Sequence, residues 1–496
     1  MARGGTGWLI CELLRRYHPR ALTRCRCWLE KGLIRLSVSL AFGLFGLQTG
    51  FFGVGELTER FNYRIYNLFA APFRNTAQRD SVPLVLVDDE DLKRHDWLWP
   101  MDYGQHAHVL EAILEFNPRS VFMDFILRDR RDDPTLDRLV QVLTRYKNSK
   151  PEIPVFVPVG KFTRPRAELR QLTRPALVEL GTEPLAHDQY FLTFKHHESP
   201  AFALYRFACE RSDCGLDGSA LSVLDTNFSS PLQIEWGLVP TPENEFLEGC
   251  KYKADQGSWS VFVYVIGRTF WGGAKAAEEP CPYMPLISLT NLVRRGFPKD
   301  LREQFAVELR KRIEGKDVIY SQAIFGVSSF VDPPTNPSVS SGYRHAMALE
   351  NLHRDGDGYL KTELKLRVPG TDDMVLTIGP GTFSMATFVI LATIHAFVSF
   401  STSRFQNSKD RPLQRHLLSA SVATIFYLSI LVAIAATQVL VLRLTPVNLI
   451  GLFGLIALVS GLTGSFYLLQ METFLARVLA LPEKSSICEQ TSGETA

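Results

Sequence analysis

Hydrophobic and polar positions separate into long uncharged runs toward the two ends of the chain and a mixed region between them. Four runs contain no Lys, Arg, Asp or Glu, and they cover residues 36–55, 374–403, 417–442 and 444–471. Each run has at least 20 residues, which is enough for an α-helix to cross a hydrocarbon layer of about 30 Å. The pattern predicts a membrane protein with four spans, at 36–55, 380–403, 416–441 and 446–471.

Between the first and second spans, short apolar runs alternate with segments of helical periodicity. We expect an amphipathic helix over 54–79 and then a short apolar run that the acids from Asp88 onward terminate. The further expected strands are 120–127, 153–160, 316–323, 361–369 and 373–379, and the expected helices are 109–116, 134–146, 198–212, 299–313 and 342–354. Strands that alternate with helices predict an α/β domain with a mostly parallel sheet. In the region of about 161–300, Pro, Gly and aromatic residues interrupt the periodic pattern. We expect this region to form a long, partly irregular insertion.

Charge sets the expected orientation of these segments. Residues 1–35 carry eight basic and two acidic side chains, a balance of +6, and the loop 404–415 carries four and one, a balance of +3. Residues 54–379 carry 39 basic and 45 acidic side chains, a balance of −6. Because short basic flanks stay in the cytoplasm, both termini are expected inside and the large domain outside.

The predicted order is therefore one span, an exported domain and three further spans. A basic cytoplasmic segment, 1–35, precedes the first span; we expect this span to be an uncleaved anchor rather than a signal peptide, because 35 residues come before it and no convincing cleavage site follows. The exported domain covers 56–379, the loop 404–415 is cytoplasmic, and 472–496 form a cytoplasmic tail. This arrangement indicates a multi-pass protein of a bacterial inner (cell) membrane with a periplasmic or extracellular main domain.

The eight cysteines divide between the two predicted compartments. Cys11, Cys25, Cys27 and Cys488 lie in the expected cytoplasmic parts, and Cys209, Cys214, Cys250 and Cys281 lie in the exported domain, where disulfides persist. The short spacing of Cys209 and Cys214 favours a disulfide between them, which leaves Cys250 to pair with Cys281.

Several polar residues fall where an open parallel sheet places its ligands, at the carboxyl ends of strands. Asp88 and Asp89 end one apolar run; they either contact a ligand or cap the next helix. Asp124 lies inside the run 121–127, where an unpaired carboxylate would be costly, so a polar site or a structural bond must satisfy it.

Two histidines open expected helices at the same edge. His106 and His345 suit ligand-type neutral imidazoles, because a helix N-terminus disfavours their protonation. Structural hydrogen bonding is the alternative, and no spacing forces a metal site. Trp99 is expected either in the wall of an apolar pocket or in the core. The candidate crevice is bordered by Asp88, Trp99, His106, Asp124 and His345.

Two blocks of the sequence, residues 82–140 and 313–356, resemble one family. Their shared features are Val87-Asp88, Trp99-Pro100, His106-Ala107, Asp124, Asp332-Pro333 and Gly342…His345-Ala346. They are similar to the type-two CHASE domain, the cyclases/histidine kinases associated sensory extracellular domain, which has an anchor before the sensor and commonly three spans after it. The resemblance implies an extracytoplasmic sensor and adds Asp332 to the expected ligand-binding set. The chain departs from the family at Ser321-Gln322, where a Gly is usual, and at Met101-Asp102-Tyr103, where an Arg follows Trp-Pro.

The function expected from these observations is sensing without an output domain of its own, because 25 residues after the last span are too few for a catalytic domain. The expected partners are an unknown small-molecule ligand, the lipid bilayer, and a separate signalling protein or a homo-oligomer. A net charge of +2 argues against nucleic-acid binding through overall charge, and no cofactor is expected. A structural subunit of a membrane assembly, or an exported enzyme with an Asp/His cluster, are the alternatives; recognisable catalytic motifs are missing from the sequence.

Overall fold

The chain divides into two compact units, of which the second, Tyr63–Thr377 with Arg443–Thr445, contains the sheet. The computed structural model describes residues 63–127, 133–160, 163–178, 189–194, 197–211, 228–241, 244, 281–294, 297–327, 330–331, 333, 339–367, 375–378 and 429–444, apart from a few residues inside the first and last ranges. Among the helices so described, none combines the length and apolar character needed to cross a membrane. The four predicted spans lie wholly or largely outside the described residues.

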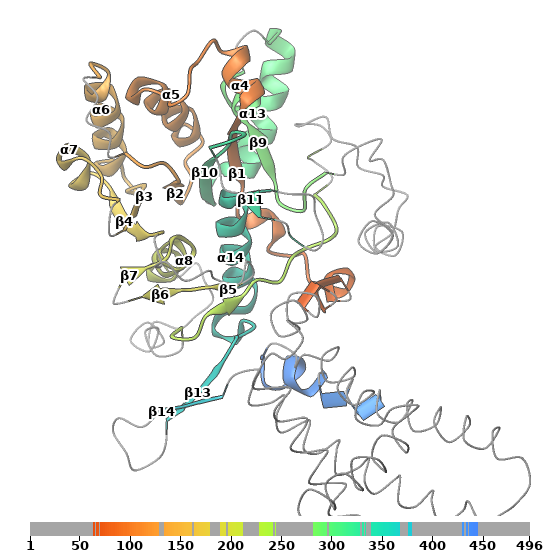
Figure 1. Cartoon of the computed structure of the whole chain (residues 1–496). Coiled ribbons are helices and arrows are strands. Elements are labelled where there is room, and N and C mark those ends of the chain that lie inside the picture. The colour runs from red at the N-terminus through yellow and green to blue at the C-terminus, as the bar shows by residue number, and fades with distance from the viewer. Residues whose placement is uncertain are drawn as a thin grey trace, which may run out of the picture. The chain divides into compact units, whose positions relative to one another are not determined.

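A six-stranded parallel sheet forms the centre of the second unit (Figure 1). Its strands, in chain order, are β1 (Leu84–Asp88), β2 (Ser120–Met123), β3 (Val155–Val159), β4 (Arg174–Leu177), β9 (Leu286–Ser288) and β10 (Asp317–Ala323). Across the sheet the order is β4-β3-β2-β10-β1-β9, and all five neighbouring pairs are parallel. The expected α/β fold with a mostly parallel sheet is confirmed.

Helices and smaller two-stranded sheets complete the unit. The helices are α4 (Asp89–Arg94), α5 (Tyr103–Leu114), α6 (Leu136–Lys147), α7 (Ala167–Arg170), α8 (Pro200–Glu210), α12 (Leu289–Val293), α13 (Lys299–Ile313) and α14 (Ser341–Asp355). The smaller pairs are β5 (Gln189–Tyr190) with β8 (Leu232–Gln233), β6 (Thr193–Phe194) with β7 (His197–Glu198), β11 (Phe330–Val331) with β12 (Val339–Ser340), and β13 (Leu364–Arg367) with β14 (Val375–Ile378).

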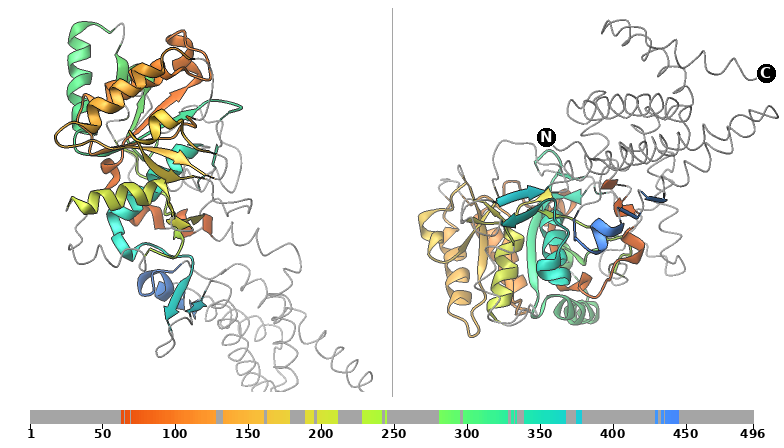
Figure 2. Two further views of the ribbon diagram at one scale, coloured as in Figure 1. Left: turned by 90° about the vertical axis from the view of Figure 1, so that its left-hand side faces the viewer. Right: turned by 90° about the horizontal axis from the view of Figure 1, so that it is seen from below.

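The direction of each crossover explains which face of the sheet its helix covers (Figure 2). Connections that step from the β9 side toward β4 contain α5, α6 and α13, and these helices share one apolar cluster with the sheet. The connection that returns from β4 to β9 contains α8, which packs in a second cluster on the opposite face together with α14. Because crossovers between parallel strands are right-handed, opposite directions of travel place helices on opposite faces.

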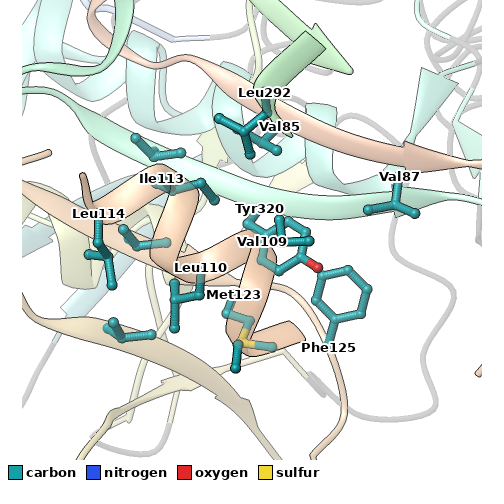
Figure 3. Close-up of a cluster of buried hydrophobic side chains, with 14 of the residues drawn as sticks. Val85, Val87, Val109, Leu110, Ile113, Leu114, Met123, Phe125, Leu292 and Tyr320 are labelled. Atoms are coloured by element: carbon teal, nitrogen blue, oxygen red, sulfur yellow. The ribbon is translucent and has the colours of Figure 1, made fainter. Parts of the chain in front are cut away.

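Strand residues alternate between these two clusters. Val85 and Val318 pack with α5 and α13, whereas Leu84 and Ile319 pack with α8 and α14. Figure 3 shows Val85 and neighbouring side chains of the first cluster. Burial on both faces accounts for the nearly continuous apolar character of the strands.

Two strands of the sheet come from the region expected to be an irregular insertion. β4 and β9 both arise from residues 161–300 and form the two edges of the sheet. They have four and three residues, which is too short for an alternating pattern to stand out. In the same region Cys209 and Cys281 are each disulfide-bonded; their expected partners lie outside the described residues, so the pairing stays a prediction.

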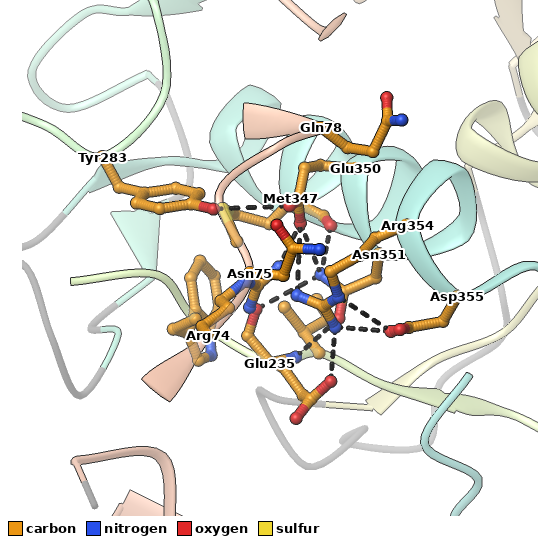
Figure 4. A network of polar contacts seen from close by, with 12 residues as sticks. Arg74, Asn75, Gln78, Glu235, Tyr283, Met347, Glu350, Asn351, Arg354 and Asp355 are labelled. Carbon is orange, nitrogen blue, oxygen red and sulfur yellow. Dashed lines mark hydrogen bonds and ion pairs between the residues drawn. The ribbon is translucent and has the colours of Figure 1, made fainter. Parts of the chain in front are cut away.

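A buried polar network joins the residues that follow the first predicted span to α14 (Figure 4). Arg74 forms an ion pair with Glu350, and the two side chains are 5% and 0% exposed. Arg354, one turn further along α14, pairs with Glu235 and with Asp355. The Arg74–Glu350 pair anchors the segment around residue 74 to α14, and the Arg354–Glu235 pair anchors Glu235 to the same helix.

Candidate functional site

The carboxyl ends of β1, β2 and β10 meet at one edge of the sheet. After β1 and β2 the chain continues into helices on the α5 face, whereas after β10, which lies between them, it continues to α14 on the opposite face. In open parallel sheets, ligands bind where neighbouring strands lead to opposite faces. The residues that end β1, β2 and β10 therefore border the expected position of a site.

Asp124 lies directly after β2 on the α14 face of this edge. Its backbone N–H donates to the carbonyl oxygen of Tyr320 at 2.8 Å, which fixes its position beside β10. Its Oδ2 accepts a hydrogen bond from Ser321 Oγ at 2.9 Å. Ser321 is fully buried while Asp124 is half-buried, so the carboxylate lies at the boundary between core and surface.

Ser321 also contacts the first turn of α14. A Cβ added at Gly342 would lie 2.3 Å from the Ser321 Cβ, so the helix can approach the strand this closely only with glycine at this position. The single Ser321 side chain therefore touches both Asp124 and the start of α14.

His345 lies in the first part of α14, next to a buried tyrosine. The Tyr190 hydroxyl is 2.7 Å from His345 Nδ1 and accepts a hydrogen bond from the backbone N–H of Ala201 at 3.2 Å. The His345 ring also meets the Phe122 ring edge-on, with 5.4 Å between centroids. Phe122 lies in β2 and precedes Asp124 by two residues, and Asp124 continues the pairing beside β10, so His345 and Asp124 share one face of the sheet.

Burial fixes the protonation of both partners. It lowers the pKa of His345 below 6.5, although the charge of Asp124 acts in the opposite direction, and it raises the pKa of Tyr190. Near neutral pH the tyrosine is protonated and the imidazole is neutral. Since Tyr190 already accepts from Ala201, we assign its proton to the bond with His345 Nδ1, which leaves the hydrogen of the imidazole on Nε2.

The structure separates the predicted set of residues into two groups. His106 and Trp99 lie on the α5 face, opposite Asp124 and His345. His106 is buried, with its Nδ1 3.2 Å from the Tyr320 hydroxyl and its ring 4.6 Å from that of Phe125, and Trp99 packs against the same cluster. The two histidines of the predicted crevice therefore lie on opposite faces of the sheet, His106 in α5 and His345 in α14.

Asp88 and Asp89 have structural partners. Asp88 is the N-cap of α4 and accepts a hydrogen bond from the backbone N–H of Asp91 at 2.7 Å; burial raises its pKa above 3.8 although this bond opposes the shift. Asp89 accepts from the backbone N–H of Phe325 at 3.0 Å, which ties the loop after β10 to α4. The capping interpretation of Asp88 is thus confirmed.

The remaining sequence predictions concern a metal and one further carboxylate. Asp332 lies outside the described residues. Within the part of the chain that the structure describes, His, Cys, Asp and Glu side chains form no group of three that would hold a metal. The arrangement around Asp124 offers instead a carboxylate acceptor and a neutral imidazole donor, which suits a polar organic ligand.

Sequence reasoning missed two neighbours of His345. Tyr190 lies in the region without clear periodicity, and nothing in the sequence connects it with a helix 155 residues later. Arg344 precedes His345 in the chain; its Nη2 donates to the carbonyl oxygen of Gln189, and its guanidinium lies 5.8 Å from the centre of the Tyr190 ring. The sequence did offer a signal for Arg344, because it lies between Gly342 and His345 in the second block that resembles the CHASE family.

Comparison with known proteins identifies the family. A family model described as the CHASE2 domain matches residues 38–452, which is most of the chain. Neither the curated proteins nor the solved structures gave a match. The match extends over both resemblance blocks, and the parallel sheet and the edge that carries Asp124 and His345 lie within it. The chain belongs to the CHASE2 family, whose domains are extracytoplasmic sensory domains in signalling.

Proposed function

We propose that this chain is a membrane-anchored extracytoplasmic sensor that binds a small polar ligand between the end of β2 and the first turns of α14. It acts by binding without turnover, and it signals through a separate partner protein or through self-association. The observation that carries the proposal is the placement of Asp124 and His345 on one face of the sheet, beside Ser321 and Tyr190.

Three features support this location. The edge lies where β10 and its neighbours lead to opposite faces, as in other open parallel sheets that bind ligands. Asp124 and His345 are both half-buried, so they are reachable from solvent while their orientations are fixed by Ser321 and Tyr190. Preorganised polar groups of this kind bind with little loss of side-chain entropy.

The test uses the full chain in lipid nanodiscs and a broad panel of small metabolites. At a concentration of 100 times its Kd, a ligand stabilises the folded state by about 3 kcal/mol. For a domain of this size, that corresponds to a rise in Tm of roughly 6–10 °C. The ligand should be recovered unchanged after incubation, as shown by mass spectrometry.

A matched pair of variants locates the binding. His345→Gln should weaken the ligand-induced rise in Tm, whereas His197→Gln, which changes an exposed histidine on β7, should not. A ligand that stabilises both variants equally would place the site elsewhere. Chemical conversion of the ligand would favour an enzyme over a sensor.

A further inference from the structure

The candidate site contains an uncapped helix N-terminus with a buried hydroxyl beside it. Ser340 occupies the N-cap position of α14 but makes no side-chain hydrogen bond to the helix. Ser340 is 3% exposed, and its Oγ has no hydrogen-bond partner among the described residues. Because the first N–H groups of a helix lack intrahelical acceptors and carry partial positive charge, this end of α14 suits an anionic group.

A cationic side chain adds to this positive end. Arg344 lies in the second half of the first turn of α14, and its guanidinium is held near Tyr190 and Gln189. The guanidinium and the helix N-terminus both favour a carboxylate or phosphate over a cation. A ligand that carried only positive charge would be repelled here.

The negative charge of the site is the Asp124 carboxylate, which accepts a hydrogen bond from Ser321. Among the described residues, Ser321 Oγ is the one donor to the Asp124 carboxylate, and a carboxylate accepts several hydrogen bonds. The remaining capacity of this half-buried carboxylate suits an ammonium group. A ligand that carried only negative charge would meet unfavourable repulsion from Asp124.

Ser321 connects the Asp124 carboxylate with the positively polarised N-terminus of α14. Its side chain donates to Asp124 and contacts Gly342, which lies two residues after Ser340. The Asp124 carboxylate and the first turn of α14 therefore both contact Ser321 on a single face of the sheet.

We propose, on the basis of the proposed function, that the ligand is a small zwitterion of the α-amino-acid type, with its ammonium on Asp124 and its carboxylate at Ser340 and the first turn of α14. The neutral His345 Nε2–H adds a hydrogen-bond donor on the same face of the sheet as Asp124. Ser321 suits such a site because it orients the Asp124 carboxylate through its hydrogen bond and packs against Gly342 in the first turn of α14.

The proposal is tested with the full chain in nanodiscs and the proteinogenic α-amino acids, one at a time at millimolar concentration. At least one should raise the Tm, while its decarboxylated amine and its deaminated acid should not. Asp124→Asn keeps the shape of the side chain and the bond from Ser321, and Ser340→Ala removes one hydroxyl; each should weaken binding on the order of tenfold or more. Asp137→Asn, on the exposed side of α6, is the matched control and should leave affinity unchanged.

Several outcomes would overturn the inference. It fails if no amino acid changes the Tm, or if Asp124→Asn binds as tightly as the parent chain while melting at the same temperature. A ligand without two opposite charges could bind to the parent chain and bind more weakly to His345→Gln. The zwitterion inference would then be wrong, while the proposed function would stand. If nothing in either panel binds, both fall.

Discussion

The buried ion pair between Arg74 and Glu350 gives a quantitative prediction for stability. Arg74→Met removes the positive charge and leaves the fully buried Glu350 carboxylate with weaker partners. Those that remain are Arg354, 3.8 Å away, the Tyr283 hydroxyl, which donates at 3.3 Å, and Asn351 Nδ2, which donates at 3.4 Å. Removal of one member of a buried pair costs about 3–5 kcal/mol, and the remaining partners favour the lower end of this range.

The expected loss is large enough to measure by thermal unfolding. At about 2–4 °C per kcal/mol for a domain of this size, Arg74→Met should lower the Tm by roughly 6–12 °C. Arg94→Met is the matched control: Arg94 pairs with Glu90 at 2.6 Å, but the side chains are 57% and 70% exposed. Its loss should stay below about 1 kcal/mol.

A double-mutant cycle isolates the pair itself. Glu350→Met alone should also destabilise the fold, but Arg74→Met/Glu350→Met should cost less than the sum of the two single changes, because no unpaired buried charge remains at this pair. The measurement is the Tm of the full chain in detergent, followed by tryptophan fluorescence. Additive losses, or an Arg74→Met loss no greater than that of Arg94→Met, would refute the reasoning.

Three further predictions concern packing, pH and disulfides. Gly342→Ala should cost about 1–3 kcal/mol through the clash with Ser321, and a much smaller loss is expected in a Ser321→Gly background; equal losses in both backgrounds would contradict the contact. Because burial lowers the pKa of His345 below 6.5, its contribution to stability is present above about pH 6.5 and is lost as the pH falls through the folded-state pKa, and melting curves of His345→Gln should lack this component. Mass mapping of non-reduced peptides should show Cys209 and Cys281 in disulfides, and we expect Cys214 and Cys250 as their partners; free thiols at these positions would exclude them.

Segments with strong periodicity were predicted closely. The helix expected at 299–313 is α13, Lys299–Ile313, and the strand expected at 316–323 is β10, Asp317–Ala323. Both have enough residues for their apolar pattern to separate from the background. The edge strands β4 and β9 were not expected in the sheet, because their pairing depends on neighbours far away in the sequence.

The site could be predicted only as a set of strand ends and helix starts. The sequence placed Asp124, His106 and His345 at one edge, but the face of each depends on the strand order. β10 inserts between β1 and β2, although it follows β2 in the chain only after about 200 residues. Right-handed crossover fixes the face of α5, which connects two parallel strands, whereas no strand of the sheet follows α14 among the described residues. The opposite faces of His106 and His345 therefore emerged only from the folded chain.

Hydrogen exchange of the full chain with a ligand from the metabolite panel tests the central claim most directly. The account predicts slower amide exchange in two segments on binding, 120–127 around Asp124 and 339–347 at the start of α14, with little change in α6 on the opposite face. Protection confined to α5 and α6, with 339–347 unchanged, would contradict a sensory site between β2 and α14.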